Sequence, residues 1–432
     1  VLSGLIILVL LVIMLIAGVP IAVALGISSV CAILPVMDLN VAVVTGAQRI
    51  FSGISVFSLL AIPFFILAGN IMNKGGIAIR LINLAKIVTG RTPGGLAQTN
   101  ILANALFGAI SGLGTAAASA MGSIIGPIEK DEGYDPNFSA AANIATAPTG
   151  LLIPPSNVMI TFSLVSGGTS VAALFMAGYI PGALWALACM LVVYIYAKKF
   201  GYRSQTKLTG KEKFNAFIQA LPCLLLIIIV IGGIIAGVFT ATEGSVVAVV
   251  YSLLLSIYGY KSMKWKDLPE IFRASAEMTG IIIFLIGVSS IMSWVMAFTN
   301  IPTMVSNGLL SISSNKYVIL LMINIILLVV GTFMDMTPAT LIFTPIFLPV
   351  CTALGMNTIH FGIMLIFNLC IGTITPPVGT TLFVGVKVGG VKIETVFKHL
   401  LPYFFAIIVV LMLVTYIPQL SLWLPGLMGY VS

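Results

Sequence analysis

Two Pro-Pro pairs inside apolar stretches constrain the fold of this chain more than any other feature. They lie in the segments GLLIPPSN at 150–157 and GTITPPVG at 372–379, and Pro154 and Pro376 are 222 positions apart. We interpret the chain as a duplicated unit, because the same offset relates further like residues: Thr115 and Thr337, Pro127 and Pro349, Gly133 and Gly355, Gly150 and Gly372, and Phe175 and Phe397.

Each unit contains an apolar helix that has to stop at its Pro pair. Proline removes backbone hydrogen-bond donors, and the flanking glycines adopt non-helical angles at little cost. Within a membrane, unwound backbone is tolerated only inside protein or beside an aqueous cavity. Interrupted helices at corresponding positions of two repeats are the sequence feature that best indicates the binding site of a transporter.

The composition predicts an integral membrane protein embedded in a lipid bilayer. Hydrophobic residues make up 59% of the 432 residues and charged residues 7%, and the mean hydropathy is +1.18. Soluble proteins carry about 25% charged residues. The net charge of +8 does not indicate nucleic-acid binding, because the basic residues lie in short links between apolar runs. The five cysteines are scattered through apolar segments, so neither a disulfide framework nor a metal site is expected.

Apolar runs close to the length that spans a bilayer, about 20 residues, define the expected helices. They are residues 1–17, 21–37, 56–72, 172–196, 221–239, 246–258, 279–298 and 400–420. The first run is expected to be a retained spanning helix and not a signal peptide, since it has no basic segment before it and no small-residue cleavage site.

Two further segments, at about 100–129 and 318–354, run apolar through a small polar patch and continue apolar. We interpret each as a re-entrant helical hairpin with its tip at mid-membrane. A Pro-Pro broken helix follows each hairpin, at about 138–166 and 361–388, and a more polar, interfacial stretch precedes it, at 77–93 and 301–317. The expected fold is an all-α polytopic membrane protein of two repeats, residues 1–210 and 211–432.

Charge in the links predicts the orientation of the two repeats. Basic residues fill the links at 198–213 and 261–273, whereas the turn at 236–244 between them has none. Both basic links are therefore expected in the cytoplasm. Counting helices from there, the first hairpin enters from the cytoplasm, the second enters from outside, and both chain ends lie outside. This is the arrangement expected of an inverted repeat.

The candidate binding residues lie at the two hairpin tips and the two helix breaks. Half-helix N-termini present free N–H groups to an anion, while unwound carbonyls and hydroxyls offer oxygen to a hard cation such as sodium. The candidate cation ligands are Ser111, Gly114, Gly150, Pro154, Asn157, Gly331, Asp335, Thr337, Gly372, Thr375 and Gly379. The candidate substrate-binding residues are Ser111, Gly112, Thr115, Ser156, Asn157, Thr337 and Thr380. For any one small residue, close helix packing is the alternative.

Asp335 is the only carboxylate deep in a strongly apolar run, where an ionised group is costly and usually functional. The alternative is a capping role at the hairpin tip. His360 and His399 are expected at helix ends near the interface, so a proton relay across the membrane lacks residues. An enzyme is not expected, because the sequence contains no P-loop, zinc spacing or nucleophile elbow.

The segment IPFFILAGNIM at 62–72, the two Pro-Pro breaks and the tip GTFMDMTP at 331–338 together resemble the large membrane subunit of tripartite ATP-independent periplasmic (TRAP) transporters. The resemblance covers essentially the whole chain. It implies an elevator-type, sodium-driven importer in the bacterial inner (cytoplasmic) membrane. The implied cargo is an organic acid anion, such as a C4-dicarboxylate or sialic acid, together with two sodium ions.

The same resemblance implies two protein partners. One is a small four-helix membrane subunit, expected as a separate chain because no such helices precede residue 1. The other is a periplasmic substrate-binding protein. Two alternatives stay open: a stand-alone sodium/carboxylate symporter, and an anion channel, against which the chain offers no ring of repeated charges.

Overall fold

The computed structural model describes residues 2–202 and 209–430, and within these ranges every regular element is helical, which confirms the predicted all-α fold. The helices before the gap are α1 (Leu2–Ile16), α2 (Ile21–Ile33), α3 (Leu39–Ile54), η1 (Phe57–Leu60), α4 (Ala61–Lys74), α5 (Ile77–Thr89), α6 (Gly95–Ser111), α7 (Gly114–Asp131), α8 (Pro136–Thr146), α9 (Thr149–Leu152), α10 (Asn157–Val165) and α11 (Val171–Phe200). Those after the gap are α12 (Gly210–Ile235), α13 (Ala241–Leu254), η2 (Leu255–Gly259), η3 (Trp265–Asp267), α14 (Leu268–Phe298), α15 (Ile301–Ile312), α16 (Lys316–Phe333), α17 (Met336–Ala353), α18 (Thr358–Thr373), α19 (Thr380–Gly389), α20 (Ile393–Tyr416) and α21 (Gln419–Leu427).

In the described part of the chain, eight helical segments are long and apolar enough to cross a membrane. A ninth is added if the pair 136–152 and 157–165, bent by 47° at the first Pro-Pro pair, counts as one span. The eight segments are Phe57–Lys74, Val171–Phe200, Gly210–Ile235, Ala241–Gly259, Trp265–Phe298, Lys316–Phe333, Met336–Ala353 and Ile393–Tyr416.

Both predicted helix breaks are present, and both Pro-Pro peptide bonds are cis. The first break separates α9 from α10, where Ile153 adopts an extended conformation. The second separates α18 from α19 over residues 374–379. Each break therefore creates a new helix N-terminus within the fold, at Asn157 and at Thr380.

Two helix pairs correspond to the predicted hairpins. Only Gly112 and Leu113 separate α6 from α7, and Gly112 has φ +64°, a conformation that glycine adopts more readily than other residues. Met334 and Asp335 separate α16 from α17. Both links fall in the polar patches at which the sequence predicts the tips, while the depth of these tips in a bilayer stays a prediction.

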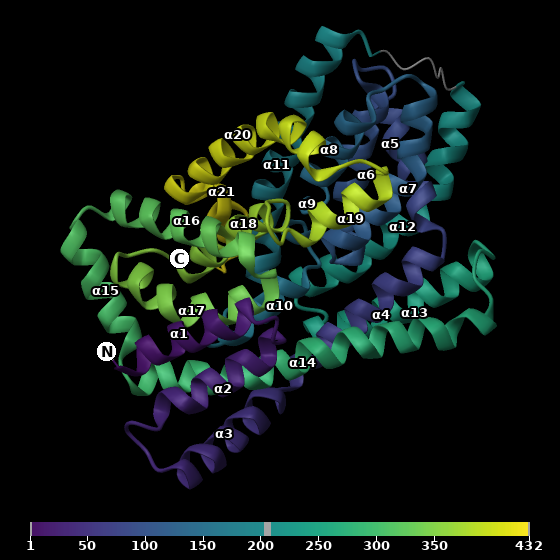
Figure 1. The fold of residues 1–432 in the computed structure, drawn as a ribbon. Coiled ribbons are helices and arrows are strands. Elements are labelled where there is room, and N and C mark those ends of the chain that lie inside the picture. The colour runs from purple at the N-terminus through teal and green to yellow at the C-terminus, as the bar shows by residue number, and fades with distance from the viewer. Residues whose placement is uncertain (1, 203–208, 431–432) are drawn as a thin grey trace.

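The two halves of the chain interlock (Figure 1). Helix α7 of the first hairpin packs against α19, the segment after the second break, and α17 of the second hairpin packs against α10, the segment after the first break. Figure 1 also shows a second group of helices, in which α14 runs past α2, α3 and α4. The hairpins and breaks thus form one bundle, built from both halves.

Several elements differ from the sequence prediction. Helices α3 and α21 are not among the predicted ones, and α14 begins at Leu268, well before the predicted start at 279. The early part of α14 carries exposed charges, including the pair Arg273 Nε to Glu277 Oε1 at 2.9 Å, so hydropathy alone does not detect it. The interfacial stretches predicted at 77–93 and 301–317 contain the helices α5 and α15.

Candidate functional site

In each half, a close backbone contact between two glycines holds the hairpin against the broken helix. A side-chain carbon added at Gly108 would lie 2.5 Å from the Cα of Gly150, and one added at Gly372 would collide with the backbone of Gly331. Real side-chain carbons essentially never approach other atoms this closely. The two crossings hold each tip beside its break, and they assign Gly150, Gly331 and Gly372 a packing role.

The first tip and the first break bring together polar atoms that lack partners. A side-chain carbon at Gly112 would lie 3.4 Å from both Asn157 Nδ2 and the carbonyl oxygen of Pro155. Asn157 is 7% exposed and Ser156 is fully buried. Among the described residues, neither polar side-chain atom of Asn157 nor the hydroxyl of Ser156 has a hydrogen-bond partner. Ser111 lies at the end of α6, where its hydroxyl donates to the carbonyl oxygen of Leu113 at 3.4 Å.

The second tip contacts the second break through Asp335. The hydroxyl of Thr380, the first residue of α19, donates to Asp335 Oδ1 at 3.4 Å. The backbone N–H of Val378 donates to the carbonyl oxygen of Thr332 at 3.1 Å, which ties the unwound segment to the end of α16. The side chain of Asp335 makes no capping hydrogen bond to α17 and is exposed.

A further contact joins the two halves at the same place. A side-chain carbon at Gly114, the first residue of α7, would lie 3.3 Å from the hydroxyl oxygen of Thr381 in α19. These contacts place four helix N-termini side by side. Their order is α10, α7, α19 and α17, with each terminus beside the next. Four helix N-termini meet within one region, as the sequence predicts for two tips and two breaks.

The remaining predicted site residues surround this region. Thr115 and Thr337 are half-buried and lie in the first turns of α7 and α17. Thr375 and Gly379 belong to the second break, where the Gly379 N–H donates to the Thr375 carbonyl oxygen at 3.1 Å. Pro154 differs, because it lines an apolar groove with Ile153, Tyr179 and Leu187.

Thr381 was not among the predicted site residues, although it lies beside Thr380. Met159 stands 222 positions earlier, so the repeat gives no signal for Thr381.

Four other buried asparagines form interhelical hydrogen bonds. Asn104 donates to Asn143 Oδ1 at 3.0 Å, and Asn368 donates to Asn324 Oδ1 at 2.6 Å.

The structure places His360 against a helix that is distant in the sequence. The residue lies near the start of α18, as expected, but its ring is 3% exposed and Nε2 lies 2.7 Å from the carbonyl oxygen of Val414 in α20. The ring is buried between helices because α20 covers this end of α18, while its depth in a bilayer stays a prediction. His399 lies nearer the surface, with Nε2 3.7 Å from Asp135 Oδ2.

Comparison with known proteins places these features in a family. Residues 8–420 match the family described as "Tripartite ATP-independent periplasmic transporter, DctM component". The chain is 36% identical to the C4-dicarboxylate TRAP transporter large permease protein DctM of Rhodobacter capsulatus, over 99% of this chain and 100% of that protein. It is 37% identical to the sialic acid TRAP transporter large permease protein SiaM of Vibrio cholerae, over 89% and 90%.

Two further similarities are consistent with this match. The chain is 53% identical to the protein YgiK of Salmonella typhimurium, over 96% of this chain and 95% of that protein. Its fold is similar to that of the YdaH transporter of Alcanivorax borkumensis, with a TM-score of 0.64 at 13% identity over 91% and 90% of the two chains. With a family match over nearly its whole length and relatives of this identity, the chain belongs to the DctM family, the large permease subunits of TRAP transporters.

Proposed function

We propose that this chain is the translocating subunit of a sodium-coupled TRAP importer for an organic acid anion of the C4-dicarboxylate or sialic acid class. It would act by an elevator mechanism in the bacterial inner membrane. The observation that carries the proposal is the meeting of the N-termini of α7, α10, α17 and α19. At each terminus, the first backbone N–H groups have no carbonyl oxygen of a preceding turn to bind. The terminus is also the positive end of the helix dipole.

Such a cluster suits a carboxylate. Unsatisfied N–H groups at a helix N-terminus form an anion site without a basic side chain. The hydroxyls of Thr115, Thr337 and Thr380 lie in the first turns of three of these helices and can donate to the same anion. The names of the relatives point to the same substrate class, because both C4-dicarboxylates and sialic acid are carboxylates.

Sodium coupling is supported by the partnerless oxygens at the first tip and by the carboxylate at the second. Buried polar atoms are nearly always hydrogen-bonded, so Asn157 and Ser156 are expected to have a ligand or water as a partner. Asn157 Oδ1, Ser156 Oγ and nearby carbonyls are hard oxygen donors. Asp335 Oδ1 and Oδ2 supply the charge that a second cation needs. The cargo would therefore be one organic anion with two sodium ions.

The partners follow from the family to which the chain belongs. Elevator motion needs one bundle to move and another to stay fixed. The interlocked hairpins and breaks form the moving part, and the helices α1–α4, α13 and α14 are the part against which a small four-helix subunit would pack. A periplasmic binding protein would deliver the substrate to the outer face.

The test is reconstitution into proteoliposomes in three sets: the chain alone, the chain with the small subunit, and both together with the binding protein. Radiolabelled substrate uptake is measured with an inward sodium gradient and, separately, with an inward proton gradient in sodium-free buffer. We expect accumulation only with the full set and only with sodium. Equal uptake by the chain alone would instead indicate a stand-alone symporter.

Counterflow separates a carrier from a channel. Vesicles preloaded with unlabelled substrate are diluted into labelled substrate, and transient accumulation is recorded. A carrier couples the two opposite fluxes, whereas a channel dissipates the gradient without an overshoot. Absence of the overshoot in the full set, at a sodium concentration that supports uptake, would contradict the proposed mechanism.

A further inference from the structure

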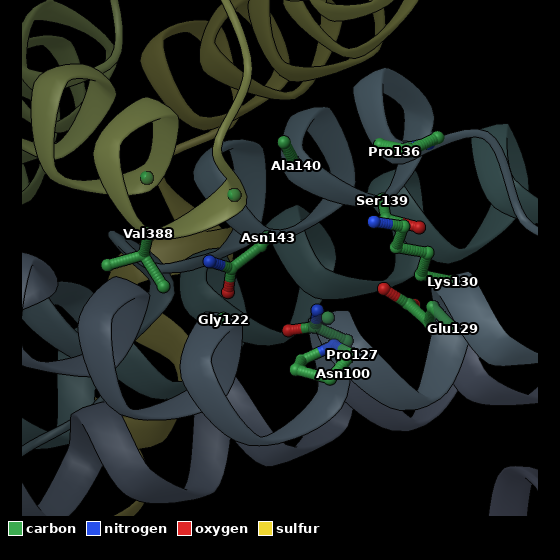
Figure 2. Close-up of a pocket in the computed structure, with 13 residues that line it drawn as sticks. Asn100, Gly122, Pro127, Glu129, Lys130, Pro136, Ser139, Ala140, Asn143 and Val388 are labelled. Carbon is green, nitrogen blue, oxygen red and sulfur yellow. The ribbon is translucent and has the colours of Figure 1, made fainter.

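A polar cavity lies away from the hairpin tips, at the opposite end of the first hairpin (Figure 2). Its volume is about 260 Å³, which has room for several water molecules. It lies between the first half of α6, the second half of α7, α8 and the second half of α19. Along α6, Asn100 is separated from Gly112 by about three turns, or roughly 18 Å. The polar end of the cavity is therefore away from the site proposed for substrate, and its other end, at Gly385, lies one turn of α19 from Thr381.

The wall of this cavity contains a buried carboxylate. Glu129 is fully buried, and among the described residues neither of its carboxylate oxygens has a hydrogen-bond partner of ordinary geometry, although the Ser139 hydroxyl lies close to the carboxylate. Figure 2 shows Glu129 facing the same space as Asn100 and Ser139. Burying an ionised carboxylate without a partner is strongly unfavourable, and buried polar groups are normally paired, so a charged Glu129 requires an occupant of the cavity.

Other partnerless polar atoms gather around Glu129. Asn100 is 1% exposed and Ser139 is 6% exposed, and the Asn100 amide nitrogen and the Ser139 hydroxyl have no partner in the described part of the chain. Such a concentration of unsatisfied atoms in one cavity is rare in native folds, where each buried polar group usually has a partner.

Lys130 also lines the cavity, and it is the obvious candidate for neutralising Glu129. Its side chain is exposed, however, and within residues 2–202 and 209–430 it makes no ion pair with Glu129. Lys130 therefore leaves the carboxylate uncompensated and places a positive charge at the cavity wall.

We infer that this cavity is a binding site for a hydrated monovalent cation of the sodium class, held by the Glu129 carboxylate and the Ser139 hydroxyl. A cation is a partner for both carboxylate oxygens at once, and hard cations prefer oxygen ligands and retain water. The remaining donors, including the Asn100 amide, bind the water that completes the shell. The site lies within the bundle that both halves build, because Gly385, Val388 and Gly389 of α19 close one wall.

The experiment measures sodium bound to the purified full-length chain in detergent, by equilibrium binding of radioactive sodium with choline chloride as the sodium-free control. We expect Glu129→Gln to bind one sodium ion fewer per chain than the wild type. Asp131→Asn is the matched control, because Asp131 is an exposed carboxylate on the same end of α7. It should bind as many ions as the wild type. Equal binding by Glu129→Gln and the wild type would overturn the inference.

Two further measurements guard against misfolding and against an ion pair with Lys130. In choline chloride, Glu129→Gln should melt at a higher temperature than the wild type, since the uncompensated charge is gone. Lys130→Gln should bind sodium several-fold more tightly, since a like charge has left the wall. If Lys130 were the partner of Glu129, Lys130→Gln would instead melt lower in choline and bind sodium no more tightly, and the inference would fail.

The outcome is independent of the sodium sites proposed at the tips. If the tip sites do not exist, the wild type binds one sodium ion and Glu129→Gln binds none. If the tip sites exist and the Glu129 cavity binds no cation, Glu129→Gln and the wild type bind the same number, while Asp335→Asn binds fewer than both.

Discussion

Asp335 and Asn157 mark the two ends of the candidate site, and their surroundings differ. Asp335 is exposed and accepts a hydrogen bond from Thr380. Asn157 is buried and its amide has no partner among the described residues. A cation would interact with Asp335 through the charge of its carboxylate. At Asn157, it would take the place of the hydrogen-bond partner that the amide oxygen lacks. The two residues therefore make separate predictions about function and stability.

Replacing Asp335 with Asn should raise the sodium concentration for half-maximal transport by about tenfold, equivalent to ~1.4 kcal/mol of binding. The change removes the charge and keeps the shape of the side chain. The measurement is uptake by the reconstituted full set against sodium concentration, with Asp131→Asn as control. A stable variant with the sodium dependence of the wild type would show that Asp335 only shapes the tip.

Replacing Asn157 with Ala should abolish sodium-dependent uptake with little loss of thermal stability, since its amide makes no hydrogen bond to the protein. Asn104→Ala is the contrasting variant, because Asn104 Nδ2 donates to acceptors on Asn100, Asn143 and Thr146. Its loss leaves buried acceptors unsatisfied and should cost roughly 1–3 kcal/mol. Thermal melting of both variants, beside transport, checks the contrast. Comparable destabilisation by the two would argue for a structural Asn157.

The residues of the site were predictable to the extent that the repeat marked them. The constant offset of 222 paired Thr115 with Thr337 and Gly150 with Gly372. The polar patches in the apolar runs indicated Ser111 and Asp335. Thr381 lacked such a signal, because its neighbourhood depends on α7 of the other half. Burial of His360 likewise depends on α20, which is distant in sequence. Contacts between segments that are distant in the sequence could not be predicted from the local sequence pattern.

At the scale of elements, helix breaks and apolar runs were predictable and surface helices were not. A Pro pair stops a helix wherever it occurs, so the breaks before α10 and α19 follow from the sequence. Helix α3 mixes polar residues such as Gln48 and Arg49 with apolar ones and remains largely exposed, so hydropathy does not separate it from a loop. The glycine crossings are also an element-scale feature, since they set how closely two helices approach.

Gly150→Ala and Gly372→Ala should each destabilise the chain by roughly 3 kcal/mol or more, at or beyond the upper end for an overpacked core. The added carbon would meet backbone atoms of Gly108 or Gly331, which cannot move as a side chain can. Gly232→Ala in α12 is the control, because nothing lies within 4 Å of the added carbon. That change should stabilise by about 0.5–1 kcal/mol. Thermal melting in detergent gives the comparison, and a wild-type melting temperature for Gly150→Ala would contradict the close approach.

The orientation of the two hairpins gives an accessibility prediction. Asp131 and Ala353, exposed at the outer ends of α7 and α17, are each replaced by cysteine in a chain without the five native cysteines. A membrane-impermeant thiol reagent should label the cysteine at position 131 only from the cytoplasm and the one at 353 only from outside. The links at 198–213 and 261–273 motivate the assignment. Labelling of both positions from one face would refute the inverted repeat.

At the scale of the whole molecule, each half supplies a neighbour that the other half lacks. Helix α19 covers α7, and α17 covers α10, so each of the two tip regions is completed by a helix encoded more than 170 residues away. Neither the tip cluster nor the Glu129 cavity exists within one half, since α19 forms a wall of both. Binding at one tip is therefore mechanically connected to the helix that carries the other break.

This exchange of helices also bears on how such a chain arose. In a single, unduplicated copy, the face of α7 that contacts α19 and the face of α10 that contacts α17 would have no neighbours. A second copy of the same unit would supply both neighbouring helices. If the repeats insert in opposite orientations, the two copies of the ancestor had to enter the membrane in both orientations and pair head to tail. Fusion would then fix one orientation for each copy and allow the two halves to differ, as Asp335 in one half and Asn157 in the other illustrate.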